Sequence, residues 1–110
     1  MQLDESRDGG VLVLDLAGRL DAGSSPPVEA KLLASVRGAP AVLLDLAGLD
    51  YVSSAGLRVL LKAAKEARAA GSRFALAGLR PAVREVFEVS GFFAVLTAYP
   101  TRAEALAALR

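Results

Sequence analysis

The stretch Leu43-Leu-Asp-Leu-Ala-Gly-Leu-Asp-Tyr-Val-Ser-Ser-Ala-Gly-Leu57 joins a buried strand to an amphipathic helix. The apolar run 41–46 predicts a central strand covered on both faces, which breaks at Gly48 and Asp50. Two serines then stand directly before a helical pattern. A hydroxyl at such a junction meets unpaired backbone N–H groups and the positive end of the helix dipole, a position that tolerates an added phosphate. The stretch therefore indicates a regulatory serine rather than a catalytic one.

The helix after the two serines has the clearest period in the chain and is predicted over residues 54–70. Gly71 fits a left-handed cap at its end. The expected inward positions are Leu57, Leu60, Leu61, Ala64 and Ala67, and the outward ones, read as a solvated helix face, are Arg58, Lys62, Lys65 and Arg68.

The remaining pattern predicts strands alternating with helices. A helix is expected from Ser24-Ser-Pro-Pro27 to Val36, another from Pro81 to a stop at Ser90-Gly91, and a last one over 103–109 after a capping box at Thr101. Strands are predicted at 2–7, 11–16, 41–46, 74–77 and 94–99. This order predicts an α/β fold in one domain over residues 1–110: a mixed sheet of about five strands, an opening hairpin plus parallel strands, with about four helices.

The composition excludes several classes of function. The 110 residues contain no His and no Cys, which removes the usual zinc sites, Ser-His-Asp triads and Cys-His dyads. A net charge of +1 favours binding to neither nucleic acid nor anionic lipid. No apolar run is long enough to insert into a membrane, and the polar start is unlike a secretory signal. We expect a cytoplasmic protein without cofactor, metal or enzymatic activity.

Three motifs, in this order and at this spacing, carry a resemblance to a known family. They are Gly18-Arg-Leu-Asp21, Asp50-Tyr-Val-Ser-Ser-Ala-Gly-Leu57 and Arg80-Pro-Ala-Val-Arg-Glu-Val-Phe-Glu-Val-Ser-Gly-Phe-Phe93. The chain closely resembles the STAS family, and within it the bacterial anti-sigma-factor antagonists. The resemblance implies a partner switch. In such a switch the unphosphorylated antagonist binds an anti-sigma factor that is also a serine kinase, which frees a sigma factor and so regulates transcription. The kinase phosphorylates the antagonist and is then released, and a serine phosphatase reverses the modification.

The resemblance also implies which residues act. By position, Ser54 would be the phosphorylated residue, with Ser53 as the alternative. Well-studied members carry Asp at position 53, a hydroxyl residue at position 55 and commonly Gly at position 58, where this chain has Ser, Ala and Arg. The expected partner surface consists of Asp21, Ser53, Ser54, Gly56, Leu57, Arg58 and Gly91.

Each of these residues also has a plainer interpretation. The serines can act only as a helix cap, and Asp21 can satisfy loop N–H groups in an Asx-turn. Gly56 suits close packing in a first helical turn, and Gly91 suits a helix C-cap. The departures at positions 53 and 58 also leave open an alternative function, a STAS scaffold that is not phosphorylated, in a lipid-transport ABC complex or a sensory assembly.

Overall fold

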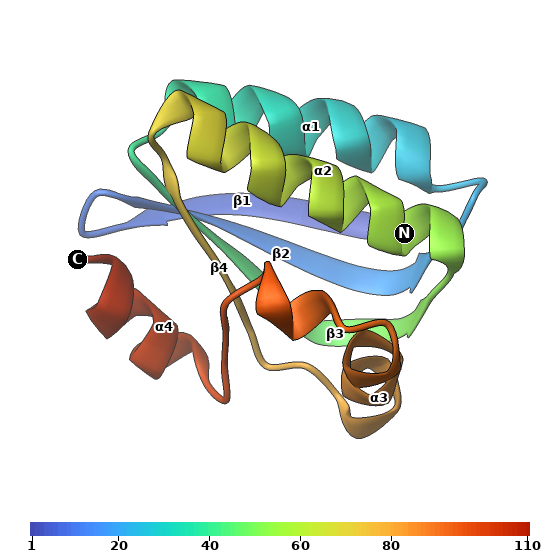
Figure 1. Cartoon of the computed structure of the whole chain (residues 1–110). Helices are drawn as coiled ribbons and strands as arrows, with labels where there is room; N and C mark the ends of the chain where they lie inside the picture. The colour runs from blue at the N-terminus through green and yellow to red at the C-terminus, as the bar shows by residue number, and fades with distance from the viewer.

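A five-stranded mixed sheet runs through the molecule, and the computed structural model describes all of residues 1–110. The strands lie in chain order (Figure 1). Only β1 and β2 are antiparallel, and the other neighbouring strands are parallel, so the predicted hairpin and mixed sheet are confirmed. The strands are β1 (Gln2–Asp8), β2 (Val11–Leu20), β3 (Ala41–Val52), β4 (Arg73–Ala77) and β5 (Ala98–Tyr99).

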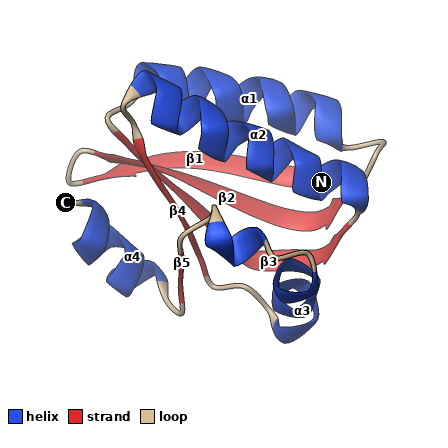
Figure 2. Cartoon of the chain, in the orientation of Figure 1, coloured by secondary structure: helices blue, strands red, loops and turns tan.

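Helices cover both faces of this sheet. The helices α1 and α2 lie side by side over one face, α3 packs near the carboxyl end of β3, and α4 covers the opposite face (Figure 2). None of these helices combines the length and the apolar character needed to cross a membrane. Their bounds are α1 (Ser25–Gly38), α2 (Ser54–Ala70), α3 (Pro81–Val89) and α4 (Arg102–Leu109), with a short 3₁₀ helix, η1 (Phe92–Ala94).

Alternation along the strands divides the core into two layers. Leu14 and Leu44 point toward α1 and α2, whereas their neighbours Val13 and Leu43 point toward α4. All four side chains are fully buried, and each such burial stabilises the fold by about 1.5–3 kcal/mol. β3 is third of the five strands and contributes to both layers, so it is the central strand that its apolar run predicts.

Two strands are longer than the sequence pattern predicts. We expected β2 to end near Leu16 and β3 near Leu46, but they continue to Leu20 and Val52. The register between them shifts twice, and Gly18 there has φ of 103°. At Gly48 a Cβ would stand 2.9 Å from the Cβ of Ala17, so the strands approach each other closely at this glycine. The glycines mark irregularities inside the strands and do not end them.

The last predicted strand is largely wrong. We expected a strand over 94–99, but only Ala98–Tyr99 is extended, and it is preceded by η1. The N–H groups of Val95 and Leu96 both donate to the carbonyl oxygen of Phe92, at 3.0 and 2.8 Å. These helical turns use the backbone groups that a strand would have paired.

The inward stripe of α2 is also shifted from the predicted one. Leu57, Leu60 and Ala67 are buried as expected, whereas Leu61 and Ala64 are only half-buried. The buried arc instead includes Val59 and Ala63, because α1 packs against the side of α2 as well as the sheet below it. The predicted outward cations Arg58, Lys62, Lys65 and Arg68 are all exposed.

An ion-pair network attaches the start of α4 to the sheet. The Arg102 guanidinium donates two hydrogen bonds to the Asp15 carboxylate, at 2.9 and 3.1 Å, and one to Asp45 at 3.1 Å. These partners, Asp15 first, raise the pKa of Arg102. Thr101 caps α4 as predicted, since its hydroxyl accepts from the Glu104 N–H at 3.2 Å, but the Glu104 carboxylate lies against the Thr101 hydroxyl and not its N–H, so the capping box is only half formed. Asp45 is only 6% exposed, so Arg102 compensates a carboxylate that would otherwise be buried without a cation.

Candidate functional site

The junction between β3 and α2 is built by a division of roles between two serines. Ser53 is the N-cap of α2, with extended backbone, and its hydroxyl oxygen accepts a hydrogen bond from the Gly56 N–H at 3.2 Å. One of the unpaired donors at the helix start is thereby satisfied. Ser53 therefore has the capping role that either serine could have taken.

Ser54 is left free by this arrangement. It is the first residue of α2, its side chain is exposed, and its hydroxyl makes no hydrogen bond within the protein. The hydroxyl therefore stands in solvent at the positive end of a helix of 17 residues. This is an accessible position for covalent modification, and one where an added negative charge is favoured.

Close packing against the end of β2 fixes the position of both serines. The Ser53 N–H donates to the carbonyl oxygen of Leu20 at 2.9 Å. A Cβ on Gly56 would stand 2.7 Å from the same oxygen and 2.9 Å from Cγ2 of Val52. Only glycine lets the first turn of α2 approach β2 and β3 this closely. The plainer interpretation of Gly56 as a packing residue is the one that the structure shows.

Asp21 follows Leu20 directly and organises the loop from β2 to α1. Its Oδ1 accepts hydrogen bonds from the backbone N–H groups of Gly23 and Ser24, both at 3.1 Å, and lies 3.2 Å from the Ser24 hydroxyl oxygen. The bonds from Ser24, the backbone N–H foremost, hold the pKa of Asp21 below its usual value. Asp21 thus makes the expected Asx-turn, and this turn brings the start of α1 to the same edge of the sheet as Ser53.

A groove of about 370 Å³ separates the first turns of α1 and α2, and its lining on α2 begins at Ala55, the residue after Ser54. Ala55 contributes to its apolar wall and Arg58 to its charged rim. Further along the rim, the Nζ of Lys62 lies 3.6 Å from a Glu29 carboxylate oxygen. The groove is lined by Ala22, Ser25, Pro26, Glu29, Ala55, Arg58, Val59 and Lys62.

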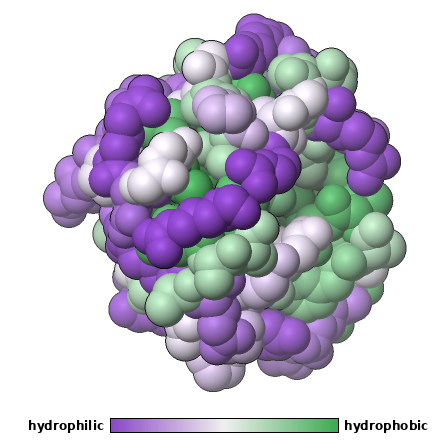
Figure 3. Space-filling model, turned by 90° about the vertical axis from the view of Figure 1, so that its left-hand side faces the viewer, coloured by the Kyte–Doolittle hydropathy of each residue, from purple (hydrophilic) through white to green (hydrophobic).

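Further charged side chains surround the strand ends. The Arg19 guanidinium lies over the Tyr51 ring, 4.2 Å from its centroid. Arg80 pairs with the carboxylate of Asp50 and donates to the carbonyl oxygen of Ala47 at 2.8 Å. The charge of Asp50 is therefore largely compensated. The opposite end of the molecule, with the β1–β2 turn and the C-terminus, has hydrophilic and hydrophobic side chains interspersed (Figure 3).

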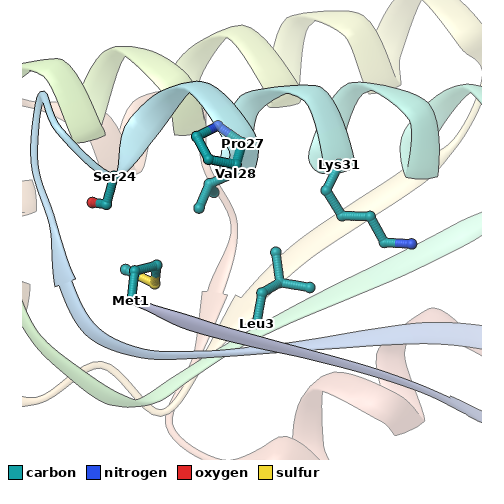
Figure 4. A pocket seen from close by; sticks show the side chains of 6 residues that line it. All are labelled: Met1, Leu3, Ser24, Pro27, Val28 and Lys31. Atoms are coloured by element: carbon teal, nitrogen blue, oxygen red, sulfur yellow. The ribbon is translucent and has the colours of Figure 1, made fainter.

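A cavity of about 440 Å³ lies elsewhere, between β1 and the start of α1 (Figure 4). Its two polar groups already have partners. The Ser24 hydroxyl donates to the carbonyl oxygen of Arg19 at 2.8 Å, and Lys31 pairs with Glu5. Met1, Leu3, Pro27 and Val28 complete its lining. No group of acidic residues in the structure is arranged to hold a metal ion. The junction at Ser54 is therefore the better candidate site.

Two predicted surface residues lie apart from this junction or beneath it. Leu57 is only 6% exposed and belongs to the core under α2. Gly91 is exposed, has φ of 71° and follows the last turn of α3, where its N–H donates to the carbonyl oxygen of Glu88 at 3.1 Å. It ends α3 as the plainer interpretation predicted, and it makes no hydrogen bond to the junction.

The contribution of α1 to the site was not predicted from the sequence. Ala22 and Pro26 face Ala55 and Val59 across the groove. The signal was present, because two helices that each follow a parallel strand must begin at the same edge of the sheet. The pair Asp50 and Arg80 was missed too, and no sequence signal joins residues 30 positions apart.

Comparisons with known proteins agree with this fold. The STAS domain matches residues 2–105. BtrV of Bordetella bronchiseptica, which is named as a candidate anti-sigma factor antagonist, is 41% identical over all of this chain and 96% of its own length. The anti-sigma F factor antagonist of Paenibacillus polymyxa is 28% identical over 99% of this chain and 95% of its own. The crystal structure of an anti-sigma factor antagonist from Mycobacterium paratuberculosis superposes with a TM-score of 0.91 at 26% identity, covering 99% of this chain and 93% of that one. The chain belongs to the STAS domain family, in its branch of anti-sigma factor antagonists.

Proposed function

We propose that this protein is a partner switch that binds an anti-sigma factor with serine kinase activity and is released when that kinase phosphorylates Ser54. A serine phosphatase would return the protein to its binding form. The observation that carries the proposal is the exposed Ser54 hydroxyl, which is free of internal hydrogen bonds because Ser53 caps the helix. The family of the chain supports the class of partner.

The fold tolerates a phosphate at this position. A phosphoserine adds about 1.5–2 negative charges. At the start of α2 the helix dipole and free N–H groups favour that charge by about 0.3–1 kcal/mol. No core residue needs to move, since the Ser54 side chain lies in solvent. We therefore expect the modified protein to keep its fold.

The effect of the phosphate falls on the docked complex instead. The groove between α1 and α2 opens beside Ser54, so a partner seated there would cover the modified side chain. Burying a doubly charged group in a packed contact requires its desolvation. A penalty of about 3–4 kcal/mol lowers the affinity several-hundred-fold, which is enough to operate a switch without refolding.

The direct test is phosphorylation by candidate cognate kinases in the presence of ATP, followed by mass spectrometry of the intact protein and its peptides. We expect one phosphate, on Ser54, and none in Ser54→Ala. Modification of Ser53 instead would move the switch to the capping serine. Absence of modification, together with recovery of a transporter ATPase as the bound partner, would favour the scaffold function.

Binding measurements with the same kinase complete the test. We expect Ser54→Ala to bind as tightly as the unmodified protein and Ser54→Glu to bind at least tenfold more weakly. Ser6→Glu is the matched control, because Ser6 is exposed on the distant edge strand β1 and the variant adds the same charge. Equal binding by Ser54→Glu and the unmodified protein would contradict the proposal.

A further inference from the structure

Arg58 is a cation without a partner, one helical turn beyond Ser54. Its side chain is exposed and forms no ion pair. The other charged groups around the helix start are already engaged. Lys62 pairs with Glu29, Asp50 pairs with Arg80, and the Asp21 carboxylate accepts the N–H groups of its own loop. Arg58 is thus the free charge closest in sequence to the candidate phosphorylation site.

The geometry of α2 directs Arg58 toward Ser54. Residues four apart lie on one face of a helix, with Cβ atoms about 5–6 Å from each other. Side chains on a helix lean toward its N-terminus, so a long side chain covers the turn before its own Cα. For Arg58 that turn is the one that begins at Ser54. A guanidinium group can therefore reach a phosphate on Ser54 without any movement of the backbone.

We propose that Arg58 binds the phosphoryl group on Ser54, so that phosphorylation closes an ion pair within α2. The inference rests on the proposed function, because it specifies how the same site is regulated. Two parallel N–H groups of the guanidinium match two phosphate oxygens, which gives a bidentate and strong contact.

The pair changes what a partner meets at the groove. In the unmodified protein Arg58 forms part of the groove rim as a free cation. In the phosphorylated protein the same guanidinium is drawn to the phosphate, and the local charge passes from about +1 to between about −0.5 and −1. A partner that binds the unmodified form is expected to present a carboxylate to Arg58. Phosphorylation then removes a favourable contact as well as adding an unfavourable charge.

The test uses full-length protein in which phosphoserine is installed at position 54 during translation, so that no kinase is needed. The pKa of the phosphate is measured by ³¹P NMR titration. A nearby cation favours the dianion, so Arg58→Gln should raise the pKa of the phosphate, by about 0.15–0.4 for a pair at this spacing. Arg58→Lys should raise the phosphate pKa by less, because the positive charge remains while the two parallel N–H donors of the guanidinium are lost. In the unsubstituted protein, the Arg58 Nε–H resonance should shift as the phosphate loses its second proton.

Lys65→Gln is the matched control. Lys65 lies on the same exposed stripe and forms no ion pair, but it is 11 residues from Ser54, about 16 Å along the helix and beyond the screening length of about 10 Å at 0.1 M salt. We expect Lys65→Gln to leave the phosphate pKa unchanged. An unchanged phosphate pKa in Arg58→Gln, or equal rises in Arg58→Gln and Lys65→Gln, would contradict the proposed ion pair.

The two proposals fail in different ways. If Arg58→Gln leaves the phosphate pKa unchanged, the ion pair with Arg58 is contradicted and the proposed switch at Ser54 is unaffected. If no cognate kinase modifies Ser54, the switch fails even where the titration shows the pair. Arg58 is exposed and outside the core, so its variants are expected to fold, and far-ultraviolet circular dichroism checks this.

Discussion

Gly56→Ala places a methyl group where the structure leaves no room for one. The new Cβ would stand 2.7 Å from the carbonyl oxygen of Leu20, 2.8 Å from its Cγ and 2.9 Å from Cγ2 of Val52. Carbon atoms pack favourably at about 3.5–4.0 Å. The Leu20 carbonyl belongs to the backbone of β2 and cannot rotate away. The start of α2 must therefore lift from the sheet, and Ser54 must move with it.

The expected loss of stability follows from two opposing terms. Forcing an extra carbon into a packed site costs about 1–3 kcal/mol. Alanine favours the helical backbone over glycine by up to about 1 kcal/mol. We expect a net loss of about 1–2 kcal/mol in the free energy of unfolding. With a slope of about 1–3 kcal/mol per molar urea, the unfolding midpoint falls by about 1 M.

Gly38→Ala is the control for this measurement. Gly38 is the last residue of α1, and a Cβ there would meet no atom within 4 Å. The same substitution should therefore leave stability unchanged or raise it by up to about 1 kcal/mol. If urea unfolding shows Gly56→Ala to be as stable as the unsubstituted protein, or stabilised in parallel with Gly38→Ala, the close approach of α2 to β2 does not exclude a side chain at position 56.

Two further predictions concern the same edge of the sheet. Ser53→Ala removes the hydrogen bond from the Gly56 N–H and should lower the free energy of unfolding by about 1 kcal/mol. Ser54→Ala should leave the free energy of unfolding nearly unchanged. Equal losses of the two variants in urea unfolding would mean that the serines share the cap. Asp21 has a lowered pKa in the folded protein, so its contribution to stability is present above its ordinary pKa of 3.8 and is lost as the pH falls through the lowered value. Asp21→Asn should therefore be less stable than the unsubstituted protein at pH 6, with a difference that shrinks toward pH 2; a difference independent of pH would show that the charge has no part in it.

The strand-to-helix junction was predictable because its signals are local. A nearly unbroken apolar run is typical of a strand in the middle of a sheet, and serines before a period of 3.6 residues mark a helix start. Both patterns describe interactions within a few residues of chain. The Asx-turn of Asp21 and the helix cap of Thr101 are equally local, and the structure shows both.

The features that the sequence did not reveal depend on contacts between distant segments. Gly48 lies inside β3, where the absence of a side chain makes room for Ala17 of the neighbouring strand. No local sequence pattern describes this contact. Val59 is buried rather than Leu61 because α1 lies against one side of α2. The groove near Ser54 also depends on distant segments, because its walls come from α1 and α2, which are separated in the sequence by the whole of β3.

The two adjacent serines explain how one site can belong to the fold and to the proposed switch at once. Helix α2 needs one side-chain acceptor at its start, and Ser53 supplies it. Gly56 and Leu20 then hold the first turn against the sheet, whatever the chemical state of the next side chain. Ser54 therefore stands on a fixed support without contributing to it. A single capping serine would couple modification to the stability of α2, because its hydroxyl could not both accept the helical N–H and carry a phosphate in the same geometry. With the roles divided, a phosphate at Ser54 changes the free energy of partner binding and not the stability of α2, as the proposed switch requires.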